Sequence, residues 1–218
     1  MADSSLVTSW AVCGIAAAAA RFLPVPLLDD VVRERAAQQA VSRTLRAHGS
    51  TLDVALLSPL WGDAGPQRFR LLRRLRSVPT RVLLFPVRKY TALFGSVRGV
   101  PTDLLRVVLL GRTVDRLLDA GSFTDATTAT TQARAVRHAV DGALGRIDLR
   151  LATAALSDGL SGIRDLTRSA VGMARRPADD AADAPVAQGA EAVVEVLRRP
   201  EVQELLARFD ADVDRRLA

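Results

Sequence analysis

Apolar residues recur every three or four positions along most of the chain, which is the period of amphipathic helices. Proline and glycine mark where the predicted helices start and stop. Alternation with period two, which would predict strands, is scarce. The pattern predicts helices over residues 5–23, 27–48, 51–60, 67–78 and 101–119, one or two more over 122–174, and a last one in 190–218.

Residues 81–94 are the exception to this pattern. They contain the β-rich run Val82-Leu83-Leu84-Phe85, but Pro86 follows it directly and would limit any strand to a short or edge strand. We favour a short helix or an irregular segment there, with the strand kept as the alternative.

The same pattern predicts an all-α protein with three parts. Residues 1–174 form one compact multi-helix bundle, and we expect an all-α fold of six to nine helices. Residues 175–189 are rich in Ala, Asp and Pro with little apolar bulk, so they are predicted to be a flexible linker. Residues 190–218 form a C-terminal amphipathic helix, whose apolar stripe needs a partner in its own core or in a second copy of the chain. The stripe consists of Val202, Leu205, Leu206, Phe209, Val213 and Leu217.

Composition determines what can fill the core. Hydrophobic residues make up 49% of the 218 residues but aromatic residues only 4%, so the core must consist mainly of Ala, Leu and Val. Such side chains favour close helix packing over sheet sandwiches, whose strands prefer aromatic and β-branched residues. The single cysteine, Cys13, excludes a disulfide within the chain and lies in an apolar run, which predicts a buried thiol.

Positive charge is concentrated in one segment. Residues 64–102, called here the basic segment, carry nine bases and no acid, while the whole chain has a formal charge of +6, which leaves −3 for the rest. Phe69, Phe85, Tyr90 and Phe94 are interleaved with these bases. We predict that eight of the bases bind an anionic surface: Arg68, Arg70, Arg73, Arg74, Arg76, Arg81, Arg88 and Lys89.

Three interpretations of the basic segment are open. It is a solvated face of a surface helix, a contact for an anionic membrane or an acidic protein partner, or a contact for nucleic acid. Nucleic acid ranks below the membrane because the chain has no helix-turn-helix or RNP motif and its C-terminal half is rich in Asp.

Motifs that carry catalytic chemistry are missing from the sequence. There is no Gly-rich phosphate loop, no GxSxG elbow, no CxxC and no set of metal ligands at the usual spacing. Asp29 and Asp30 could bind a cation, but in the first turn of a helix they are better explained by stabilising the helix dipole and by a pair between Asp30 and Arg33. The sequence therefore predicts a protein that is not an enzyme, with no cofactor, and a bundle that binds an apolar ligand or lipid is the rival class.

The apolar run near the N-terminus is relevant to where in the cell the protein is found. Residues 6–20 fall short of the roughly 20 residues of a membrane-spanning helix. Asp3 is the only charge before Arg21, so the positive start of a secretory signal is missing. These features predict a cytoplasmic protein, and the membrane interpretation of the basic segment would place it at the inner face of the membrane.

Residues 16–30 read Ala-Ala-Ala-Ala-Ala-Arg-Phe-Leu-Pro-Val-Pro-Leu-Leu-Asp-Asp, a small-residue helix that runs into a Pro-x-Pro break and an acidic helix start. This stretch resembles one found in uncharacterised bacterial helical proteins and is similar to the helical hairpins of EcsC-type proteins. The resemblance implies a helical fold and a peripheral membrane role. It implies no catalytic residues.

Overall fold

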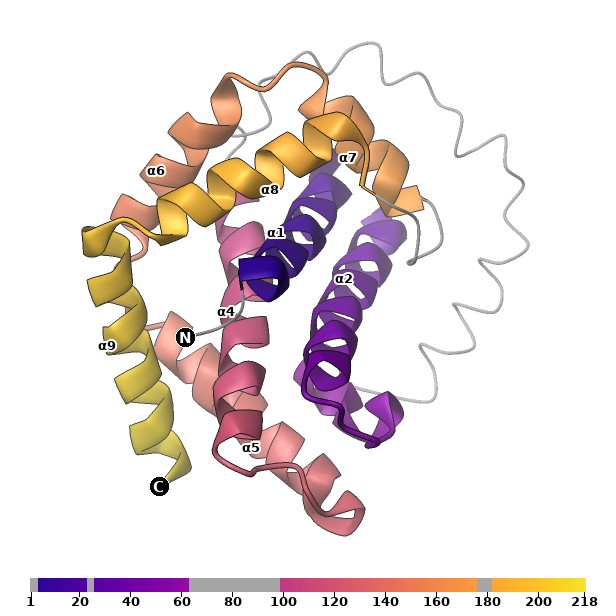
Figure 1. Cartoon of the computed structure of the whole chain (residues 1–218), viewed down its shortest axis with the longest axis vertical. Helices are drawn as coiled ribbons and strands as arrows, with labels where there is room; N and C mark the ends of the chain where they lie inside the picture. The colour runs from indigo at the N-terminus through magenta and orange to yellow at the C-terminus, as the bar shows by residue number, and fades with distance from the viewer. Residues whose placement is uncertain (1–3, 23–25, 63–98, 176–181) are drawn as a thin grey trace.

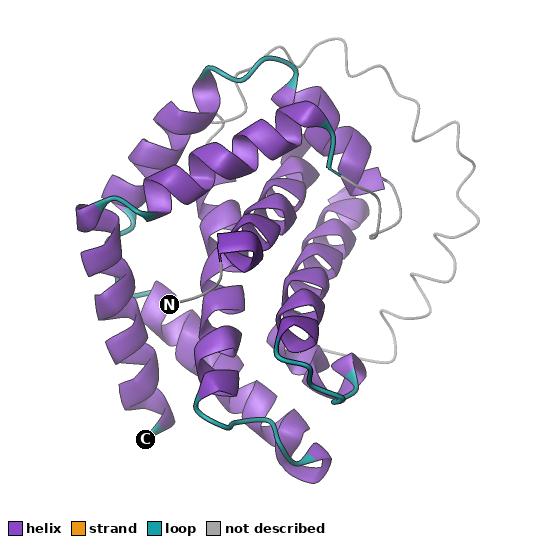
Figure 2. Ribbon diagram, viewed as in Figure 1, coloured by secondary structure: helices purple, strands orange, loops and turns teal. Residues whose placement is uncertain are grey.

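The computed structural model describes residues 4–22, 26–62, 99–175 and 182–218, and in these ranges it contains helices and loops but no strand (Figures 1 and 2). The predicted all-α bundle is confirmed. In chain order the helices are α1 (Ser4–Ala19), η1 (Ala20–Phe22), α2 (Pro26–Ala47), η2 (Val54–Leu60), α4 (Val100–Asp119), α5 (Ala126–Leu144), α6 (Arg150–Ser161), α7 (Leu166–Arg175), α8 (Ala184–Leu197) and α9 (Pro200–Leu217).

Helix α1 is the centre of the bundle. It packs against α2, α4, α7 and α8, and Figure 1 shows it enclosed by them. Ala11, Ile15 and Ala18 have no exposed surface, as expected for a helix that is apolar on all sides. Residues 4–22 are also long and apolar enough to cross a membrane by length and composition, but 61% of that window is buried inside the protein. Its apolar character is therefore explained by its place in the core.

The core is built by close approach of small residues, as the composition predicts. Gly111 on α4 lies directly against the indole of Trp10 on α1, and a Cβ built on Gly111 would come within 2.7 Å of that ring. The Trp10 indole is buried and donates its Nε1–H to the hydroxyl of Thr44 on α2 at 2.9 Å. One aromatic side chain thus joins three helices.

Two predicted helix stops are confirmed by backbone geometry. Gly49 and Gly121 adopt positive φ angles of 63° and 77°, which glycine tolerates without strain. The following residues complete Schellman motifs, because the Ser50 N–H donates to the Leu45 carbonyl at 3.0 Å and the Ser122 N–H donates to the Leu117 carbonyl at 2.8 Å.

Several predicted boundaries are wrong. Residues 122–174 form three helices, α5, α6 and α7, rather than one or two. Residues 184–189, assigned to the linker because of their low apolar bulk, form the first turns of α8. Low bulk is what close packing needs here: a Cβ on Gly189 would lie 3.1 Å from side-chain carbons of Ile15 on α1 and Leu166 on α7.

The C-terminal region is two helices rather than one. Helix α8 ends at Leu197, and α9 begins at Pro200, whose ring suits the first turn of a helix. The predicted stripe of α9 is confirmed, since Val202, Phe209 and Val213 are fully buried. Helix α9 packs on α5 of the same chain, so the stripe needs no second copy to cover it.

Some predictions fall outside the described residues. They are the helix over 67–78, the open alternatives over 81–94, the eight proposed surface-binding bases and the 176–181 part of the linker.

Candidate functional site

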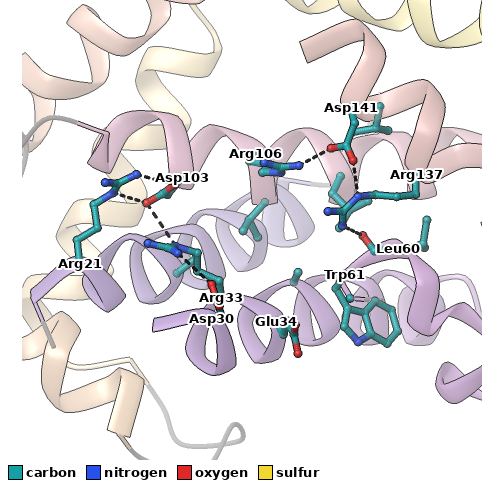
Figure 3. A pocket seen from close by; sticks show the side chains of 16 residues that line it. Arg21, Asp30, Arg33, Glu34, Leu60, Trp61, Asp103, Arg106, Arg137 and Asp141 are labelled. Atoms are coloured by element: carbon teal, nitrogen blue, oxygen red, sulfur yellow. Dashed lines mark hydrogen bonds and ion pairs between the residues drawn. The ribbon is translucent and has the colours of Figure 1, made fainter. Parts of the chain in front are cut away.

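A hollow of about 390 Å³ lies between α2, α4 and α5, with η1 and η2 at its ends (Figure 3). Its floor is apolar and includes Ala37, Leu110 and Val140. Its walls carry four arginines and four carboxylates, so we call it the charged hollow. These residues are Arg21, Arg33, Arg106, Arg137, Asp30, Glu34, Asp103 and Asp141.

Asp103, in the first turn of α4, organises one end of the hollow. It accepts two hydrogen bonds from Arg21, from Nε at 2.5 Å and from Nη2 at 3.2 Å. Arg33 Nε lies 3.6 Å from the same carboxylate. The hydrogen bond to Asp103 is the main reason that the pKa of Arg21 is raised above its usual value. Asp103 therefore ties η1 and α2 to the start of α4.

Arg33 also pairs within its own helix. Its Nη2 donates to Asp29 Oδ2 at 2.8 Å, and its Nη1 lies 3.5 Å from Asp30. The sequence prediction that Asp30 pairs with Arg33 is confirmed, and the structure adds the closer pair with Asp29. Within the described residues, Arg33 Nε and Asp29 Oδ1 are buried atoms that make no hydrogen bond. Such orphaned atoms are rare in folded proteins and mark this end of the hollow as incompletely satisfied.

Asp141 on α5 organises the other end. It accepts hydrogen bonds from Arg106 on α4 and from Arg137 Nε, the latter at 2.6 Å (Figure 3). Arg137 Nη1 also donates to the Leu60 carbonyl at 2.7 Å, which fixes the end of η2. Trp61 follows directly and lines the wall opposite Arg106, as the close-up shows.

Charged groups of both signs line the hollow along its length. At the Asp141 end, Arg106 and Arg137 share the carboxylate of Asp141. Glu34 on α2 also lines the hollow, and a Cβ on Gly62 would come within 3.1 Å of its carboxyl group. At the Asp103 end, Arg21 and Arg33 face Asp29, Asp30 and Asp103.

Two further side chains that could take part in a reaction, those of His48 and Cys13, lie outside the hollow. His48 Nε2 is 2.8 Å from Asp115 Oδ1 and joins the end of α2 to α4. Cys13 is buried, and its desolvation raises the pKa of the thiol from 9.0 to about 11, so a reactive thiolate is disfavoured. Among the residues that the structure describes, no three His, Cys, Asp or Glu side chains come together as a metal site.

An ion-pair cluster joins α9 to α4. Asp210 is largely buried and accepts from Arg112 Nη2 at 2.7 Å and Nε at 3.1 Å, while Arg116 Nη1 lies 3.1 Å from it. Arg116 also pairs with Asp214 at 2.5 Å. This cluster uses two of the acids on the C-terminal helix, Asp210 and Asp214.

The eight bases predicted to bind an anionic surface all lie outside the described residues. The structure does describe the chain on both sides of them, up to Gly62 and from Gly99 onward. Gly62 lines the charged hollow, and Gly99 lies against the guanidinium of Arg21, which lines it too. The described ends that flank residues 63–98 therefore both meet this hollow. Sequence reasoning missed the hollow itself, because its defining pairs join residues far apart in the chain.

Comparison with protein-family models, with curated proteins and with solved structures finds no match to the chain. The resemblance of residues 16–30 to EcsC-type hairpins therefore stays a prediction. The function has to be inferred from the geometry and charge of this chain.

Proposed function

We propose that the protein is a non-enzymatic cytoplasmic module whose helical bundle presents the basic segment, residues 64–102, to an anionic membrane surface. The observation that carries the proposal is an imbalance of charge. The basic segment has nine bases and no acid, whereas arginines of the described helices, such as Arg33, Arg112 and Arg137, pair with carboxylates of the bundle. A segment with no acids of its own attracts an anionic partner.

The bundle provides support for this role. All nine bases of the basic segment lie between Gly62 and Gly99, and both glycines meet the charged hollow. Their neighbours are held by hydrogen bonds, from Arg137 to Leu60 and from Arg21 to Asp103. Each Lys or Arg near an anionic bilayer contributes about 1 kcal/mol, so a few suffice for weak, salt-sensitive binding.

The rival class, a bundle that binds an apolar ligand, has less support. The described core is filled by small side chains at close approach, with Ala11, Ala17 and Ala40 almost fully buried. The charged hollow has an apolar floor, but its walls carry eight charged side chains. A deep apolar cavity would have favoured the rival.

Co-sedimentation with vesicles tests the proposal. Full-length protein is mixed with phosphatidylcholine vesicles or with vesicles that contain about a third phosphatidylserine. We expect sedimentation only with the anionic vesicles, and a large loss in the triple variant Arg70→Glu, Arg73→Glu, Arg74→Glu.

A matched triple variant controls for net charge. Arg150, Arg168 and Arg208 lie on described helices with side chains 94%, 79% and 77% exposed, and reversing them changes the formal charge by the same amount. We expect this control to keep most of the binding. Equal binding to both vesicle types, or equal loss in both triple variants, overturns the proposal. Competition by duplex DNA would favour nucleic acid instead, and binding to an acidic protein without vesicle binding would favour a protein partner.

A further inference from the structure

A second hollow lies between the first turns of α1 and the last turns of α2, two helices that pack side by side (Figure 1). Its volume of about 310 Å³ is at the lower end of the range of ligand pockets, which is roughly 300–1,000 Å³. We call it the α1–α2 hollow. Among its described lining residues two carry a positive charge and none a negative one, unlike the lining of the charged hollow. These residues are Ser5, Leu6, Ser9, Arg43, Arg46 and Ala47.

The two arginines of this hollow have no carboxylate partner among the described residues. They lie three positions apart on α2, so their side chains are neighbours on the helix surface. Arg43 is partly buried and its Nη1 donates to the Ser9 hydroxyl at 3.0 Å, whereas Arg46 is exposed. Other arginines of the bundle, such as Arg112 and Arg137, pair with aspartates. The positive charge of this pair is therefore not neutralised by the described bundle.

Acidic residues are scarce along both helices that form the hollow. Helix α1 and η1 contain no Asp or Glu, and α2 contains none after Glu34. Asp3 precedes α1 and lies outside the described residues. Near the end of α2, Asp115 and Asp119 of α4 face His48. The described surroundings of the α1–α2 hollow therefore favour an anion.

A serine hydroxyl adds a further donor to the hollow. Ser9 Oγ accepts the hydrogen bond from Arg43, so its own hydrogen can be donated to a ligand. The neighbouring Thr8 differs, because its hydroxyl already donates to the Ser4 carbonyl at 2.9 Å. After its bond to Ser9, the Arg43 guanidinium keeps most of its N–H donors. An oxyanion in the hollow can therefore accept from side chains of both helices.

A buried contact directly beside the hollow fixes its shape. Trp10 follows Ser9, and its Nε1 donates to the hydroxyl of Thr44, which follows Arg43. Thr44 in turn donates to the Ala40 carbonyl at 2.8 Å. These bonds hold α1 and α2 in register, so the donors are in place before a ligand arrives, which lowers the entropic cost of binding.

We propose that the α1–α2 hollow binds the phosphate group of a phosphate monoester, with Arg43 and Arg46 as its charged partners and the Ser9 hydroxyl as a third donor. A phosphate monoester carries a charge of about −1.5 to −2 at neutral pH, which two guanidinium groups match. A carboxylate or a phosphodiester carries a single charge and leaves one arginine uncompensated. The small volume of the hollow favours a phosphate with a short substituent.

Calorimetric titration of the full-length protein tests the site with glycerol 3-phosphate, a phosphate monoester. Dimethyl phosphate, which is a phosphodiester, and acetate are the singly charged comparisons. We expect glycerol 3-phosphate to bind about ten-fold or more tightly than either, because it meets both arginines with nearly two charges.

Two variants remove the charged partners, and a third on the same helix is the control. Arg43→Gln and Arg46→Gln should each weaken the binding of glycerol 3-phosphate about ten-fold or more. Arg35→Gln makes the same change of charge at an exposed position of α2 that does not line the hollow, and it should leave the affinity unchanged. Since Arg46 is exposed, its replacement keeps the packing of α1 on α2. Thermal unfolding followed by circular dichroism checks that each variant is folded.

The outcomes of these titrations are distinct. The proposal is overturned if glycerol 3-phosphate binds no more tightly than dimethyl phosphate and acetate, or if Arg35→Gln loses as much affinity as Arg46→Gln. It is also overturned if the charge-reversed triple variant of the basic segment loses the binding while Arg43→Gln and Arg46→Gln keep it. The hollow contains no residue of the basic segment, so the two proposals succeed or fail separately.

Vesicles distinguish the two sources of a phosphate monoester, a lipid headgroup and a free metabolite. Phosphatidylcholine vesicles contain either phosphatidic acid, whose headgroup is a monoester, or phosphatidylserine, whose phosphate is a diester, at equal total charge. Stronger sedimentation with phosphatidic acid that is lost in Arg46→Gln and kept in Arg35→Gln supports a lipid headgroup. Equal sedimentation with both vesicles, together with binding of glycerol 3-phosphate, supports a free metabolite.

Discussion

At the scale of single residues, contact between α1 and α4 depends on the absence of a side chain. A Cβ on Gly111 would lie 2.7 Å from Cδ1 and Nε1 of Trp10, whose ring is 1% exposed and held by Thr44. We therefore expect Gly111→Ala to lower the free energy of unfolding by about 1–3 kcal/mol, the usual cost of overpacking. Urea unfolding measures the change.

Gly172 provides the control for this substitution. It lies inside α7, and a Cβ there would meet nothing within 4 Å. Gly172→Ala should be neutral or stabilising by up to about 1 kcal/mol, because alanine is the better helix former. Equal effects of the two substitutions would contradict the packing explanation.

The Cys13 thiol gives stability a pH dependence. Burial raises its pKa from 9.0 to about 11, only partly offset by Arg43. As the pH rises, the thiol ionises in the unfolded chain before it does so in the folded protein, which favours unfolding. The free energy of unfolding is therefore unaffected by this group below about pH 9 and falls by on the order of 2 kcal/mol as the pH rises toward 11. Urea midpoints at several pH values should fall more steeply in wild type than in Cys13→Ala. Parallel pH curves would show that the thiol does not cause the loss.

At the scale of elements, α9 is fixed by one largely buried carboxylate. Asp210 binds Arg112 and Arg116 of α4, whereas the pair that Glu204 of the same helix makes with Arg208 is exposed. Asp210→Asn should cost about 1–3 kcal/mol because it removes the negative charge that Arg112 and Arg116 share, although Arg116 keeps its pair with Asp214. Glu204→Gln should cost less than about 0.5 kcal/mol. Chemical denaturation of both variants measures the difference, and similar losses would refute the role of Asp210.

At the scale of the whole molecule, α8 covers the central helix while α9 covers α5. The sequence pattern predicts a linker up to residue 189 and a separate C-terminal helix after it, but the fully buried Val186, Ala190 and Val193 make α8 part of the core. We expect a chain that ends at residue 199 to unfold cooperatively at a lower temperature, and one that ends at 183 to lose cooperative unfolding. Calorimetry compares them, and equal melting of the two truncated chains would show that α8 is dispensable.

The sequence alone was sufficient to predict those helix bounds and helix ends that depend on a local pattern of residues. Helical periodicity predicted the bounds of α2 and α4 closely, and glycine chemistry predicted the ends at Gly49 and Gly121. In the charged hollow, only the pairing of Arg33 with Asp30 was predicted, because these residues lie three positions apart on one helix.

Tertiary structure decided what depends on contacts between distant segments. Arg21 and Asp103 are 82 positions apart, and Arg112 and Asp210 are 98 apart, so no local pattern connects them. The start of α8 was missed for the same reason, because Gly189 has little bulk of its own and is buried through α1 and α7. By itself the sequence determined the helices, the small-residue core and the charge of the basic segment, since these follow from spacing and composition. The fold alone decided which charges meet and where they leave a hollow, because those depend on how the helices pack.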